Sequence, residues 1–117
     1  MGTNYYAVRN RPTTGVPLHI GKSSAGWLFL FHQIEDNWNE PPVCWNTYNQ
    51  VRDWLKKYTV DSDDYVILDE YDEIVSFDKF FDMVDSKQND EHCKSNKKNF
   101  EYCKNIDGYR FSDRDFC

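Results

Sequence analysis

Long apolar runs are missing from this 117-residue chain. No stretch approaches the roughly 18–20 apolar residues that a membrane span needs. The opening Met1-Gly2-Thr3-Asn4-Tyr5 has neither a basic region nor an apolar core, so we expect no signal peptide. Tyr6 stands where the myristoylation pattern requires Ser or Thr. These absences predict a soluble protein of the cytoplasm with no membrane partner.

Cysteine is scarce and widely spaced, at positions 44, 93, 103 and 117, and no C-x-x-C pair occurs. Because no export signal points to an oxidising compartment, we expect free thiols rather than disulfides. The three histidines, His19, His32 and His92, show no ligand spacing with the cysteines. We therefore predict no metal site and no cofactor.

Acidic residues are absent from residues 1–34, which carry Arg9, Arg11 and Lys22 and hence a net charge of +3. Residues 61–91, by contrast, hold twelve acids against Lys79 and Lys87, within a whole-chain net charge of −6. The plainer interpretation of this acidic block is a solvated face that aids solubility. The alternative is a surface that covers a basic partner.

The hydrophobic pattern predicts a small α+β domain over residues 1–117, with a mostly antiparallel sheet and about two packed helices. Strands are expected at 4–9, 17–20, 26–34, 65–68 and 74–75, and a short one near 109–111. Turns or loops are expected at 10–16, 21–26, 35–42 and 69–73. The polar segment 86–105 is expected to be exposed.

Two helices carry start signals. Thr47 with Gln50 three residues later matches a capping box, and Tyr48, Val51, Trp54, Leu55 and Tyr58 follow on one face. Ser76 is placed to cap a second helix, whose predicted buried stripe comprises Phe77, Phe80, Phe81 and Val84.

The stretch from His19 to Trp27 combines one histidine, one lysine and two serines between Gly21 and Gly26. It is not a P-loop, because Gly15 lies six residues before Gly21 and the following segment is a strand rather than a helix. A glycine-flanked turn with hydroxyls and a lysine nevertheless suits a phosphate, and nearby aromatic rings suit a base. The predicted ligand-binding residues are Tyr5, Tyr6, His19, Lys22, Ser23, Ser24 and Trp27. The plainer interpretation is a β-turn with locally bonded serines and a solvated lysine.

Catalytic chemistry finds little support. His19 with Ser23 or Ser24 has no orienting acid within 15 residues and no strand-to-helix elbow. The acids of residues 69–73 are interrupted by Tyr71 and lack the EF-hand pattern. We predict no catalytic residues and expect a binding protein rather than an enzyme.

Four segments of the sequence carry a resemblance to known proteins: the opening Met1–Tyr6, the stretch His19–Trp27 with Phe29 and Phe31, the segment Leu68–Tyr71, and the ending Asp107–Ser112. In these segments the chain resembles a group of small proteins of tailed bacteriophages. Many of those proteins place a C-x-x-C pair before the histidine, which suggests a zinc site there. Residues 9–15 of this chain contain no cysteine, so that zinc is expected to be absent here.

The resemblance implies a phage accessory protein acting in the host cytoplasm against antiviral defence. One mechanism is sequestration of a nucleotide-derived immune signal, of the cyclic ADP-ribose or cyclic oligonucleotide class, by the acid-free N-terminal region. The alternative is an acidic inhibitor that binds a host defence protein directly, in the manner of an anti-CRISPR or DNA mimic. A pocket shared between protomers would suit so small a chain, so a homo-oligomer is an alternative to the monomer.

Overall fold

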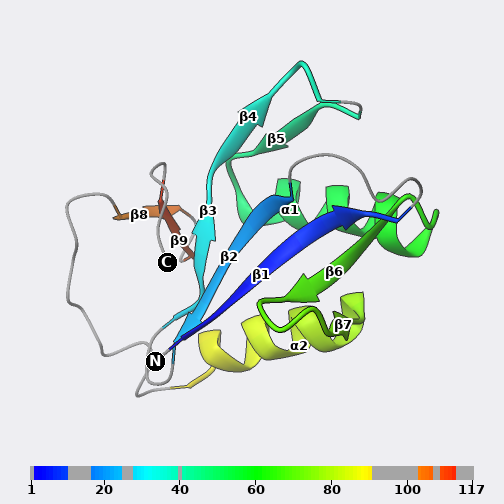
Figure 1. The fold of residues 1–117 in the computed structure, drawn as a ribbon. Coiled ribbons are helices and arrows are strands. Elements are labelled where there is room, and N and C mark those ends of the chain that lie inside the picture. The colour runs from blue at the N-terminus through cyan, green and yellow to red at the C-terminus, as the bar shows by residue number, and fades with distance from the viewer. Residues whose placement is uncertain are drawn as a thin grey trace.

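The fold was analysed in a computed structural model, which describes residues 2–10, 17–24, 28–39, 41–90, 103–106 and 109–112. Over these residues the chain is α+β, as predicted, with two α-helices and a mostly antiparallel main sheet (Figure 1). The sheet strands are β1 (Gly2–Arg9), β2 (Leu18–Ser24), β3 (Leu30–His32), β6 (Tyr65–Asp69), β7 (Ile74–Val75), β8 (Cys103–Ile106) and β9 (Tyr109–Ser112).

The described strands of the main sheet run in the order β7-β6-β1-β2-β3-β9-β8. All neighbouring pairs are antiparallel except β3 and β9, which pair in parallel with Phe31 opposite Phe111. The N-terminal strand β1 therefore lies in the middle of the sheet, between β2 and β6. The C-terminal hairpin β8–β9 lies at one edge.

Both helices begin where the sequence predicts. Helix α1 (Tyr48–Leu55) has a complete capping box, since Gln50 N donates to Thr47 Oγ1 and Thr47 N donates to Gln50 Oε1. Helix α2 (Phe77–Gln88) is capped by Ser76, whose hydroxyl oxygen accepts from Lys79 N. A short π-helical segment, η1 (Lys56–Val60), continues α1 toward β6.

One face of the main sheet packs on the helices through an aromatic core. Phe29 and Phe31 of the sheet side meet at 4.7 Å between ring centroids, and Phe29 meets Phe80 of α2 at 5.3 Å. The predicted stripe of α2 is buried, and so are Val51, Trp54 and Leu55 of α1. Because aromatic side chains bury much area each, a chain this small can form one continuous core from them.

Three expectations need correction. Residues 21–24 do not form a turn, because β2 runs on to Ser24. The predicted loop at 35–42 begins later than expected, because Glu35 and Asp36 belong to β4 (Ile34–Asp36). This strand pairs with β5 (Val43–Trp45), which follows the loop, in a second, two-stranded sheet in which Trp45 packs on Trp54. The expected strand 26–34 is shorter, as β3 covers Leu30–His32. The polar segment 86–105 is not among them: Ser86, Asn89 and Asp90 are exposed as expected, and within the segment α2 extends to Gln88 and β8 begins at Cys103.

Other expectations agree with the fold or lie outside the described residues. The first strand, the strand at 65–68 and its hairpin to Ile74-Val75 are confirmed. The expected loop at 11–16 and the polar segment 91–102 fall outside the described residues. No helix among the described residues is long and apolar enough to cross a membrane.

The C-terminal hairpin is held to α1 by a tyrosine pair. The Tyr48 and Tyr109 rings stack at 3.9 Å with an interplanar angle of 11°, and the Tyr48 hydroxyl donates to Asp85 Oδ1 of α2 at 2.9 Å. Burial, followed by the hydrogen bond to Asp85, raises the pKa of Tyr48 above its ordinary value. Burial, with a contribution from the charge of Asp85, also raises the pKa of Tyr109.

This pair predicts a loss of stability at alkaline pH. In the unfolded chain the phenols ionise near their usual pKa of about 10, whereas in the folded chain they hold their protons to higher pH. The unfolded state then binds fewer protons, so the free energy of unfolding should fall as pH rises above about 10. Tyr48→Phe removes one such phenol, and its stability, measured by urea unfolding at a series of pH values, should fall less steeply. Parallel curves for the two proteins would contradict this account.

Candidate functional site

The face of the main sheet opposite the aromatic core carries the polar side chains of interest. Side chains alternate between faces along a strand, and Ala7, Ile67 and Phe111 are buried on the helix side. Their neighbours in the strands therefore point the other way. We call this the outer face and define it by Asn4, Tyr6, Val8, His19, Lys22, Leu30, His32, Leu68 and Arg110. Within the described part of the chain, neither α-helix lies on it.

A β-bulge decides which residues of β2 reach the outer face. Tyr5 pairs with Gly21 but Tyr6 pairs with His19, so Ile20 is an extra residue in β2. In a regular strand, residues 19 and 22 would point to opposite faces, because their separation is odd. The bulge reverses the alternation between them. It therefore puts His19 beside Tyr6 and Lys22 beside Asn4 on one face.

Gly21 permits this bulge. A Cβ atom at Gly21 would collide with the Leu30 carbonyl oxygen and with the Phe29 ring. The glycine is therefore required by close approach of β3 and of a core aromatic ring. A glycine inside a strand pattern is a known signal of a bulge, but the polar residues that follow it had suggested a turn.

The rings of the outer face contact one another in sequence. The Tyr6 and His19 rings stack, with centroids 5.1 Å apart at 26°, and the His19 and His32 rings are tilted, with centroids 5.4 Å apart at 34°. His19 Nε2 is 2.9 Å from Asn4 Oδ1. Since an amide oxygen can only accept, Nε2 is the donor in this arrangement. The three rings thus form a row across β1, β2 and β3, with His19 held in the middle by Asn4.

Two cationic residues lie on the same face, in register with Leu30. Lys22 pairs with Leu30, and Leu30 pairs with Arg110 of β9. Their backbones are two strand spacings apart, or about 10 Å. The outer face therefore carries a row of rings and, next to it, the two cationic side chains of Lys22 and Arg110. Both of these residues are partly buried.

The predicted site residues are only partly brought together. Tyr6, His19 and Lys22 share the outer face. Tyr5 lies on the opposite face, where its ring packs on Phe29 and Phe80 and where burial, with the charge of Asp69, raises its pKa. Ser23 alternates toward the helix side as well, and Ser24 is at the end of β2, where its carbonyl oxygen accepts from Lys87 Nζ of α2 at 2.7 Å. Trp27 lies outside the described residues.

The sequence interpretation missed other residues at this site. Asn4 and His32 could have been found from period-two alternation with Tyr6 and Leu30. Arg110 could not, because its place depends on the parallel pairing of β9 with β3. Glu70 approaches from the β6–β7 turn, and its Oε1 accepts from the backbone N of Asn4 at 2.9 Å. No group of three metal-ligating side chains occurs among the residues that the structure describes.

The bulge predicts a specific sensitivity at Gly21. Gly21→Ala should lower the free energy of unfolding by about 1–3 kcal/mol, because Leu30 or the Phe29 ring must shift to admit the methyl group. Urea unfolding followed by tryptophan fluorescence measures the change. As a matched control, Asn49→Ala on the exposed side of α1 should stay within about 0.5 kcal/mol of wild type. Equal stability of Gly21→Ala and wild type would contradict the packing described here.

Comparison of the chain with protein-family models, with curated proteins and with solved structures gave no match in any of the three. The site is therefore interpreted from its own geometry.

Proposed function

We propose that the protein binds a nucleotide-type anion on the outer face of its sheet. The observation that supports this most strongly is the row of Tyr6, His19 and His32 rings beside Lys22 and Arg110. Every nucleobase presents a flat π-face, and sheet surfaces with exposed rings bind bases by stacking. Lysine and arginine at the neighbouring positions suit the phosphate.

In this proposal the biological role is sequestration, as the resemblance to phage proteins implies. The protein would act in the cytoplasm of an infected host and hold a nucleotide-derived immune signal of the cyclic ADP-ribose or cyclic oligonucleotide class. A binding protein lowers the free concentration of its ligand by mass action and needs no catalytic group. It therefore has to be present at a concentration comparable to that of the signal.

The direct test is calorimetric titration with cyclic di-GMP, cyclic di-AMP, cyclic ADP-ribose, GMP and AMP. We expect at least one of them to bind. Tyr6→Ala should weaken binding by about five- to 150-fold, the range for loss of one base–ring stack. Lys22→Ala should weaken it by about tenfold or more, as expected for a lost charge-assisted hydrogen bond. Lys79→Ala, at an exposed position on α2, serves as the control and should leave binding unchanged.

If none of the five nucleotides binds, the proposal is contradicted. Unchanged binding in both Tyr6→Ala and Lys22→Ala would contradict it as well.

A second measurement separates sequestration from an enzymatic role. The bound nucleotide is released by denaturing the protein and analysed by chromatography. Sequestration predicts intact nucleotide, and cleavage products would show an enzyme instead.

A second candidate function is direct inhibition of a host defence protein through the acidic block. It is favoured by one observation, the exposure of Tyr71 and Ile74 (70% and 75%) among the carboxylates of the β6–β7 turn. Exposed aromatic and aliphatic side chains within a charged surface are typical of protein interfaces. Carboxylates of Asp78 and Asp82 on α2 extend the same charge.

This alternative predicts capture of a nucleic-acid-binding host protein in a pull-down. Capture should be lost in the doubly reversed variant Asp78→Lys, Asp82→Lys and should be competed by added double-stranded DNA. The same variant should still bind any nucleotide that wild type binds, because both substitutions lie away from the outer face. If neither charge reversal nor DNA affects capture, the acidic block is a solvated face only.

A further inference from the structure

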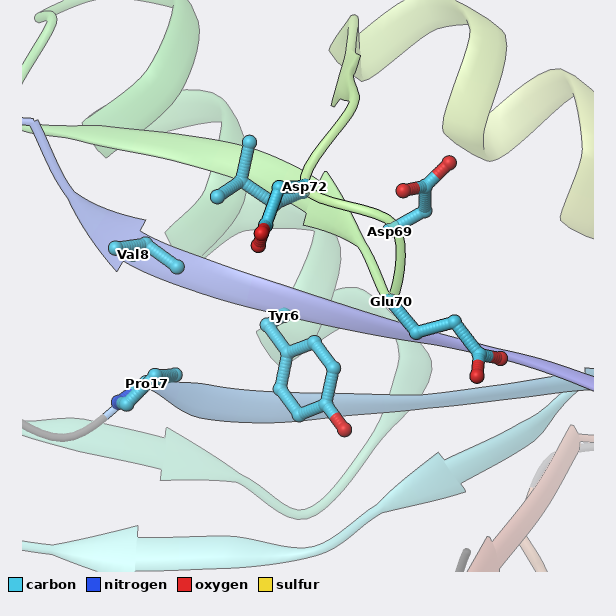
Figure 2. A pocket seen from close by; sticks show the side chains of 7 residues that line it. Tyr6, Val8, Pro17, Asp69, Glu70 and Asp72 are labelled. Carbon is cyan, nitrogen blue, oxygen red and sulfur yellow. The ribbon is translucent and has the colours of Figure 1, made fainter.

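A cavity opens on the outer face next to the ring row. It lies over β1, between the start of β2 and the β6–β7 turn, and has a volume of about 200 Å³ (Figure 2). The side chains that line it come from three separate segments, and they are Tyr6, Val8, Pro17, Leu68, Asp69, Glu70 and Asp72. Tyr6 belongs both to this cavity and to the ring row, so the two features are continuous.

The floor and one wall of the cavity are apolar or aromatic. Leu68 of β6 lies opposite Tyr6 of β1, Val8 is two residues further along β1, and Pro17 borders the cavity from the β2 side. The Tyr6 ring forms the wall toward His19. Such surroundings suit a flat ring that is desolvated on its faces, and Tyr6 gives it an aromatic contact.

The rim carries carboxylates on a turn that is ordered before any ligand arrives. Asp69 Oδ1 accepts from Tyr71 N at 2.8 Å and from Glu73 N at 3.0 Å. Asp72 has a φ of 62°, in the left-handed region that few non-glycine residues adopt. Glu70 is fixed by its bond from Asn4 N. Of these three carboxyl groups, Asp69 is committed to the turn, whereas Glu70 and Asp72 lie at the rim with acceptor capacity remaining.

We propose that this cavity takes the base of a guanine nucleotide, with Glu70 and Asp72 as the residues that select it. Guanine presents adjacent N–H donors, at N1 and at its exocyclic amino group, and carboxylate oxygens accept from both. Adenine offers an amino donor but an acceptor at N1, which a carboxylate repels. The phosphate then extends toward Lys22, on the same face beyond Tyr6. This inference rests on the proposed function and adds to it the identity of the base.

The test compares GMP, IMP and AMP in calorimetric titrations of wild type, Glu70→Gln and Asp72→Asn. Wild type should bind GMP about tenfold or more tightly than AMP, the size expected for a paired hydrogen-bond contact. IMP, which keeps the N1 donor and lacks the amino group, should fall between them. In each variant the preference for GMP should shrink, while AMP binds as well as before or better. Glutamine at position 70 keeps an oxygen for Asn4 N, so the turn should be retained.

Asp82→Asn, on the exposed side of α2, is the control and should keep the full preference. Equal affinity of wild type for GMP and AMP would overturn the inference, and so would a preference that survives in both variants; the proposed function would still stand. If none of the three nucleotides binds and the cyclic compounds are also silent, the proposed function fails with it. Binding of spermidine in the cavity, lost in Asp72→Asn, without nucleotide binding would show a cation site and overturn the inference as well.

Discussion

The arrangement of the outer face depends on one backbone irregularity, the bulge at Ile20 and Gly21. It lets Ile20 stay in the core while Gly21 accommodates the Phe29 ring, and it reverses the alternation of β2 between His19 and Lys22. Without it, the ring row and the lysine would lie on different sides of the sheet. The packing of Ile20 and Gly21 on the core side of the sheet therefore determines that the ring row and Lys22 share the outer face.

The aromatic core lies on one side of the sheet only, and the polar residues lie on the outer face. Both helices contribute to one aromatic cluster on the same side of the sheet, where Phe80 meets Tyr5 and Phe29. The tyrosine pair of α1 and β9 then fixes the C-terminal hairpin beside β3. Because β9 alternates Phe111 inward with Arg110 outward, anchoring the hairpin in the core also positions a cation on the outer face. Folding and site assembly are therefore linked through the same contacts.

Local signals in the sequence were sufficient for much of the fold. Both helix caps, the buried stripe of α2 and the hairpin after Leu68 follow from neighbouring residues and were predicted. The site was harder, because Gly21 was interpreted as part of a turn rather than as a bulge within β2. Tyr5 and Tyr6 are adjacent and chemically alike, yet only the register of β1 assigns one to the core and the other to the outer face. The place of Arg110 depends on a parallel pairing between strands about 80 residues apart, which no local pattern encodes.

Amide chemical-shift mapping by NMR, during titrations with GMP and with the cyclic nucleotides, tests most directly whether ligands bind on the outer face of the sheet. If they do, the largest shifts fall on Asn4, Tyr6, His19, Lys22 and the turn at residues 70–72, while the exposed side of α2 remains unchanged. Shifts concentrated on α1 or α2, or no shifts with any of these nucleotides, would contradict binding on the outer face.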